Sequence, residues 1–161
     1  QKNLLFLQSY KDDDRITEED IVEAIPKTLQ DNIFDLTQLI LTKKIDQARD
    51  LVKDLTLQGE DEIKLIAIML GQFRLYTQVK ILQESGQKES QMVSSLGHYL
   101  GRNPNPYQIK FALRDSRRLS LDFLQNSIRY LIQADYQIKT GVYEKGYLFE
   151  KALLQIASQS N

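Results

Sequence analysis

The segment that most constrains the fold runs from Gly59 to Gly86 and reads GEDEIKLIAIMLGQFRLYTQVKILQESG. It has the length and residue types of one long helix, yet apolar side chains occur all around its circumference. A surface helix keeps one polar face, so a helix that is apolar all round is expected to be enclosed on all sides. We therefore predict that the part from Asp61 to Glu84 is the central helix of a bundle.

Polar residues interrupt the apolar sequence from the middle of this helix onward, among them Gln72, Arg74, Gln78 and Lys80. A long polar side chain can cover apolar surface with its stem while its polar head stays in water. We expect these residues to lie at the ends of the helix or to extend outward along their stems.

The rest of the chain also reads as helical. It holds only 3 prolines and 7 glycines, and no run alternates apolar and polar residues as a strand does. Two short helices are expected within residues 1–26, ended by Pro26, and a junction at residues 26–30 follows. The expected helices after it cover residues 31–44, 45–59, 61–86, 89–101, 106–119, 121–141 and 147–158. Short loops between helices favour antiparallel neighbours, so the prediction is an all-α helical bundle.

Composition excludes several classes of protein. The 161 residues carry 21 Lys and Arg against 22 Asp and Glu, so the net charge of −1 provides no overall attraction to nucleic acid or anionic lipid. The absence of cysteine excludes disulfides and zinc–thiolate sites and suits a cytosolic protein. No apolar run approaches the roughly 20 residues of a membrane span. Because the first residue is Gln1, we expect the chain to be a fragment of a longer protein.

The sequence offers little catalytic chemistry. It has no GxxxxGK[ST] motif for nucleotide phosphates, and its one histidine, His98, cannot build a metal cluster by itself. The DDD run at residues 12–14 lacks the ligand spacing of a calcium loop and is interpreted as a plain polar loop. Ser94 and Ser95 have no base nearby in the sequence. We therefore expect no catalytic residue, no metal site and no cofactor.

A basic stretch from 102 to 118 is the first candidate for binding. It contains five cationic residues and the single acid Asp115, a local net charge of 5 − 1, or +4. These residues could contact phosphates or an acidic partner, or they could form an ordinary solvated face. The cationic residues are Arg102, Lys110, Arg114, Arg117 and Arg118.

The second candidate is KTGVYEKG at residues 139–146, an expected loop between two core helices. It places Tyr143 between Lys139 and Lys145, and an exposed aromatic ring with flanking lysines can stack on a base while the ammonium groups lie near phosphate. The plain alternative is a simple turn, in which Gly141 and Gly146 serve only the backbone.

Taken in order, several segments resemble a known family. They are DNIFDLTQLILTKKIDQARDLVKDLTLQGEDEIKLIAIMLGQFRLYTQVKILQESG, RRLSLDFLQNSIRYLIQADYQIKTG and LFEKALLQIA. The most specific pieces are LQGEDEIKLIAIMLGQFRLYTQVK and ADYQIKTG followed by LFEKALL. Together they resemble the C-terminal part of the delta subunit of bacterial DNA polymerase III, the clamp-loader subunit that opens the sliding clamp.

The resemblance implies a division into domains. Residues 1–26 correspond to the end of the small helical lid domain, and residues 27–161 to the helical collar domain, a non-catalytic domain that packs against the collars of neighbouring loader subunits. It implies tau/gamma and delta-prime as partners in the bacterial cytoplasm, and contact with the sliding clamp only through a missing N-terminal domain. Gln72 and Arg74 become candidates for partner contact.

The resemblance also implies a position near primed DNA. In the family, an aromatic residue in the last loop between helices can meet the primer end, and here the matching region is KTGVYEKG, with Tyr143 as the candidate. Two other readings remain open: a stand-alone nucleic-acid-binding bundle that uses the basic 102–118 segment, and a small helical enzyme. Co-purification with loader subunits would favour the collar, and salt-dependent DNA binding by the chain itself would favour the nucleic-acid-binding bundle.

Overall fold

The computed structural model describes residues 28–100 and 106–160, with only the backbone described at 97–100 and 106–108. Seven α-helices make up most of these residues, and no strand occurs among them. The predicted all-α class is therefore confirmed. The helices are α3 (Leu29–Leu41), α4 (Ile45–Leu57), α5 (Glu62–Glu84), α6 (Glu89–Leu100), α7 (Pro106–Ser116), α8 (Leu121–Lys139) and α9 (Lys145–Ala157).

One compact unit, Ile33–Asn161, contains nearly all of the described residues. The two short helices expected within residues 1–26 lie outside the described residues, as does the DDD run. The boundary expected between residues 26 and 27 therefore stays a prediction. The side chain of His98 and the whole of Arg102 also lie outside the described part of the chain.

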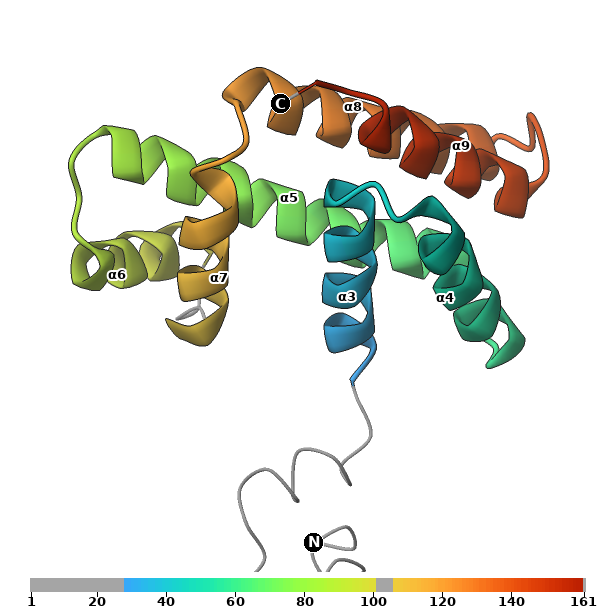
Figure 1. Cartoon of the computed structure of the whole chain (residues 1–161), viewed down its shortest axis with the longest axis horizontal. Helices are drawn as coiled ribbons and strands as arrows, with labels where there is room; N and C mark the ends of the chain where they lie inside the picture. The colour runs from blue at the N-terminus through green and yellow to red at the C-terminus, as the bar shows by residue number, and fades with distance from the viewer. Residues whose placement is uncertain (1–27, 101–105, 161) are drawn as a thin grey trace, which may run out of the picture. The chain divides into compact units, whose positions relative to one another are not determined.

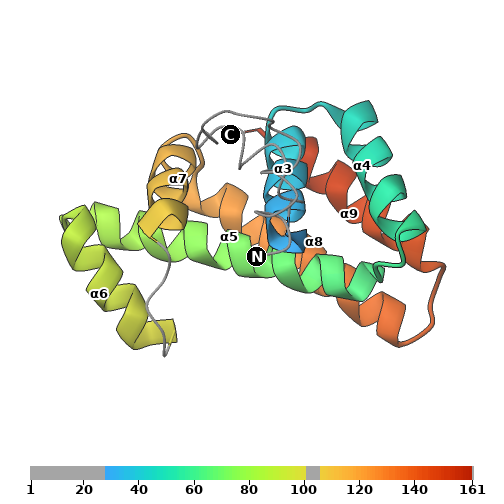
Figure 2. The same ribbon diagram turned by 90° about the horizontal axis from the view of Figure 1, so that it is seen from below.

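The long helix α5 is the centre of the bundle, as predicted. Helices α7, α8 and α9 all pack against it, and α8 and α9 pack against each other. Figure 1 and Figure 2 show α8 and α9 running alongside α5, with α6 and α7 near its C-terminal end and α4 near its N-terminal end. The buried residues of α5 are Leu65, Ile66, Met69, Leu70, Phe73, Tyr76 and Val79.

Enclosure of α5 on all sides was a wrong expectation, because one stripe of the helix faces solvent. Its exposed residues recur at intervals of three, four or seven and are Lys64, Ala67, Gly71, Arg74, Ile81 and Glu84. Two of these positions are Ala67 and Gly71, which have no large side chain to bury. By length and composition α5 also meets the criterion for a membrane span, which we did not expect, but the core helix of a bundle meets the same criterion.

The tight ends of the helices have a common backbone pattern. After four helices one residue adopts a positive φ, and the next N–H donates to a carbonyl five residues earlier, as in a Schellman motif. At the end of α3 this residue is Lys43 (φ 62°), with Lys44 N–H donating to Leu39 O over 2.8 Å. At the other three ends it is a glycine, because glycine adopts a positive φ without strain: Gly59, Gly86 and Gly141.

The starts of α4 and α3 are stabilised in different ways. The side chain of Asp46 does not cap α4; its N-cap is Lys44, and Asp46 lies in the first turn. Asp31 lies inside α3, where its carboxylate accepts from Thr28 N–H and its own N–H donates to the Thr28 hydroxyl. This reciprocal pair is a capping box with aspartate in the place of glutamate.

Candidate interaction surfaces

The α8–α9 loop exposes several large apolar side chains at one end of the bundle. Tyr143 is 64% exposed and Val142 is 59% exposed. The Tyr143 ring lies 4.9 Å from that of Tyr147, centroid to centroid, at an interplanar angle of 45°. Gly141, with φ of 69°, makes the turn out of α8 that this placement needs. The sequence-predicted aromatic is therefore presented to solvent.

The two lysines that flank this loop, one at the end of α8 and one at the start of α9, both pair with carboxylates. Lys139 Nζ lies 2.9 Å from Asp135 Oδ2, one turn back on α8. Lys145 Nζ lies 3.0 Å from Asp61 Oδ2, at the start of α5. Exposed pairs of this kind contribute little to stability, but they neutralise the positive charge that the sequence placed beside Tyr143.

Asp61 is engaged on both oxygens. Its Oδ1 accepts from the N–H of Ile63 over 2.8 Å, as the N-cap of α5, while Oδ2 faces Lys145. The Ile63 N–H and then the Lys145 ammonium lower the pKa of Asp61 below its ordinary value of 3.8. Because the folded pKa is the lower one, the stabilisation is present above the ordinary value and is lost as the pH falls through the folded value.

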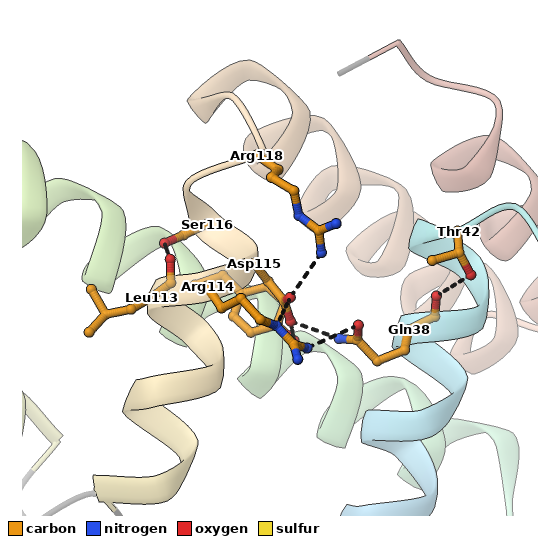
Figure 3. Close-up of polar contacts among 8 residues, drawn as sticks. Gln38, Thr42, Leu113, Arg114, Asp115, Ser116 and Arg118 are labelled. Atoms are coloured by element: carbon orange, nitrogen blue, oxygen red, sulfur yellow. Dashed lines mark hydrogen bonds and ion pairs between the residues drawn. The ribbon is translucent and has the colours of Figure 1, made fainter.

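The basic 102–118 segment is organised around one buried acid. Asp115 is 1% exposed and accepts from Gln38 Nε2 over 2.7 Å. Its other oxygen lies 3.1 Å from Arg114 Nε and 3.4 Å from Arg118. Figure 3 shows these three side chains, from α3, α7 and the turn after α7, converging on Asp115.

Tyr76 of α5 completes this cluster from the core side. Its hydroxyl donates to Asp115 Oδ2 over 3.2 Å, and its ring contacts Phe73 edge to face. Burial first, and the nearby Asp115 carboxylate second, raise the pKa of Tyr76 far above its usual range, so the hydroxyl stays protonated as a donor. The Asp115 cluster therefore joins α3, α5 and α7 through one carboxylate.

Consequently the predicted basic patch offers a partner less positive charge than its five cationic residues suggest. Arg114 is committed to Asp115 and also lies over the ring of Phe111, 4.9 Å from its centroid. Lys110 and Arg117 are exposed, while Arg102 lies outside the described residues. Arg114 and Arg118 thus lie close together because both pair with the buried Asp115 carboxylate.

The polar residues of α5 have different surroundings. The Thr37 hydroxyl of α3 lies 2.8 Å from Gln72 Oε1, inside the domain. Lys80 Nζ donates to the carbonyl of Ser116 at the end of α7 over 3.0 Å. Arg74 is exposed on the solvent-facing stripe. Of the two predicted partner-contact residues, Gln72 therefore faces its own domain and Arg74 faces outward.

The sequence analysis did not predict that Asp115 is buried, although the sequence contains a signal for it. Asp115 follows Ile109 and Ala112 at intervals of three, which places it on the buried face of α7. We counted it only as the one acid among five cations. Among the described residues no group of three His, Cys, Asp or Glu side chains is arranged to hold a metal ion.

Comparison with known proteins identifies similar chains. A family model described as the DNA polymerase III delta subunit, C-terminal domain, matches residues 30–156. The DNA polymerase III subunit delta of Bacillus subtilis (strain 168) is 32% identical over 149 residues, which are 92% of this chain and 41% of that protein. The solved structure of a Bacillus subtilis DNA clamp loader delta protein matches with a TM-score of 0.81 at 30% identity, covering 98% of this chain and 45% of the other. The chain thus spans less than half the length of these relatives.

Proposed function

Because the chain belongs to the DNA polymerase III delta subunit family, as its C-terminal domain, we propose that it is the non-catalytic collar of a clamp loader. In this role it holds neighbouring loader subunits together while the sliding clamp is loaded onto primed DNA in the bacterial cytoplasm. The observation that carries the proposal is the family match, which covers all of α4 to α8 and most of α3 and α9. We also propose that contact with the sliding clamp is made by a part of the subunit outside this chain, which spans 41% of the Bacillus subtilis relative.

The solvent-facing stripe of α5 is the surface we assign to a neighbouring subunit, in the family either tau/gamma or delta-prime. A collar needs a surface for partners in addition to its own core, and this stripe lies on the central helix. Ala67 and Gly71 leave its middle flat, and a Cβ added at Gly71 would meet no atom within 4 Å. Small residues let a second helix approach closely, and Arg74 and Ile81 offer a charge and an apolar contact beside them.

Gly71→Leu tests this assignment without harming the fold. Leucine has a higher helix propensity than glycine by roughly 0.5–1 kcal/mol and meets open space at this position, so the domain should become slightly more stable. A delta subunit that carries the change should assemble with the other loader subunits about 5- to 150-fold more weakly, since forcing bulk into a packed interface costs about 1–3 kcal/mol. Pull-down and analytical ultracentrifugation measure assembly, and denaturant unfolding measures stability.

The control for that experiment is Gln125→Leu, which places an exposed leucine on α8 and so tests the effect of the added apolar surface alone. It should leave assembly unchanged if the α5 stripe is the interface. Unchanged assembly with Gly71→Leu would place the partner on another face. Arg74→Glu provides a second change on the same stripe, by reversing its charge.

We also propose that Tyr143 meets the primer–template junction in the assembled loader. Its exposure and its glycine-bounded loop support this role. The bundle alone should bind DNA weakly, since Lys139 and Lys145 are both paired with carboxylates. The affinity for DNA therefore has to come from the complex, and Tyr143 contributes selectivity for the primed end.

Tyr143→Ala should reduce the preference of the loader for primed over single-stranded DNA about 5- to 100-fold, because one stacking contact contributes about 1–3 kcal/mol. The melting temperature of the domain should hardly change, because the side chain is largely exposed. Tyr136→Ala is the matched control, because this tyrosine is as exposed as Tyr143, at 65%, but lies on α8 outside the loop. An equal loss with both variants would show that the effect is not specific to the loop.

The alternative of a stand-alone nucleic-acid-binding bundle depends on the 102–118 segment. Lys110 and Arg117 are exposed and favour it, but Arg114 and Arg118 already serve Asp115. Binding of the isolated chain to DNA at sub-micromolar affinity, weakening steeply with salt, would support this alternative over the collar.

A further inference from the structure

Helices α5 and α9 begin beside each other, although their first residues are far apart in the sequence. Lys145, the first residue of α9, places Nζ 3.0 Å from Oδ2 of Asp61, 84 residues earlier. The next residue, Gly146, lies so close to the first turn of α5 that an added Cβ would be 3.8 Å from Glu62 Oε2. The start of α9 therefore contacts the start of α5 through Lys145 and lies close to it at the next residue.

The start of α9 lacks the residues that usually stabilise a helix N-terminus. Its N-cap residue, Glu144, makes no side-chain cap hydrogen bond, and its first turn contains no acid. Lys145 puts a cation where the helix dipole favours an anion. The carboxylates of Asp61 and Glu62 place negative charge from α5 beside this first turn.

The aromatic pair of the loop depends on the same helix start. Counting from Glu144 as N-cap, Tyr143 is the residue before the cap and Tyr147 is the third residue of the helix. Their ring contact lies one position short of a hydrophobic staple, which joins the residue before the cap to the fourth helical residue, but it likewise connects the incoming chain to the first turn of α9. A shift at the start of α9 would therefore move the Tyr143 ring.

We propose that Asp61 and Lys145 form a clip that holds the α8–α9 loop on α5 and so sets the position of the Tyr143 ring. Both are positioning residues, and the ligand of the preset ring is the flat face of a base or base pair. The proposal rests on the proposed DNA contact of Tyr143. It gives Lys145 an internal role in place of a contact with phosphate.

Three single variants separate the clip from a phosphate contact. Asp61→Asn removes the charge but keeps a good N-cap residue for α5. Lys145→Gln removes the other half of the clip. Lys139→Gln is the matched control, because it removes an equal charge from the same loop region while breaking only the pair with Asp135.

Amide hydrogen exchange of the chain tests the clip directly. Exchange across residues 141–147 should become about two- to fivefold faster in Asp61→Asn and in Lys145→Gln, as expected for loss of one exposed ion pair. The double variant should be no faster than either single one, since both remove the same interaction. Unchanged exchange in both single variants, or the same acceleration in Lys139→Gln, would overturn the clip.

The preference of the assembled loader for primed DNA tests the positioning role. With the clip, Asp61→Asn and Lys145→Gln both reduce this preference about two- to fivefold. With a phosphate contact, Lys145→Gln reduces binding while Asp61→Asn maintains or increases it, because the ammonium is released; that result overturns the proposal. If Tyr143→Ala has no effect on DNA preference but the exchange results hold, the clip stands and the proposed DNA contact fails.

Discussion

Phe73→Ala is expected to lower the free energy of unfolding by about 3–5 kcal/mol, the loss that follows truncation of a buried phenylalanine. Phe73 is 0% exposed in the middle of α5, and its ring meets that of Tyr76 edge to face at 5.9 Å. Truncation leaves a cavity in the core between α5 and the helices that pack against it, α7, α8 and α9. Urea or guanidinium unfolding of the chain measures the effect.

The control for Phe73→Ala lies on the same helix. Ile81 is 45% exposed on the solvent-facing stripe, so Ile81→Ala should cost below about 1 kcal/mol. A loss below about 1 kcal/mol for Phe73→Ala as well would contradict the central position of α5 in the core.

Asp115→Ala is expected to cost about 2–4 kcal/mol, because it leaves the buried Tyr76 hydroxyl and the Gln38 amide without their acceptor. The ion pairs with Arg114 and Arg118 add little to this figure, since both arginine side chains are more than half exposed. Denaturant unfolding again provides the measurement.

Two further variants separate the parts of this effect. Arg118→Ala should cost about 1 kcal/mol or less, as for an exposed pair. Tyr76→Phe removes the hydroxyl that Asp115→Ala leaves unpaired, so the double variant should lose less than the sum of the two single losses. Strictly additive losses would mean that Tyr76 and Asp115 act independently, against the geometry of the cluster.

In the α8–α9 loop, residue types predicted the exposure of the ring but not the pairing of the charges. Its glycines, its aromatic and its lysines suggested an exposed ring with free positive charge, and the ring is exposed. The charge is not free, because each lysine has a carboxylate partner. Asp135 is one helical turn from Lys139 and could have been paired with it from the sequence, whereas Asp61 reaches Lys145 only through the packing of α5 beside α9.

The sequence by itself determined the helices and their order, because helix formation depends on local properties: the spacing of apolar residues, the caps and the scarcity of Gly and Pro. It also indicated that α5 is central, because large apolar residues occur around most of the circumference of this helix. Only the tertiary structure decided which stripe of α5 stays exposed and that Asp115 is the buried partner of Tyr76 and Gln38. Those outcomes depend on side chains that are 39 to 77 residues apart and become neighbours only when helices pack, so no local pattern encodes them.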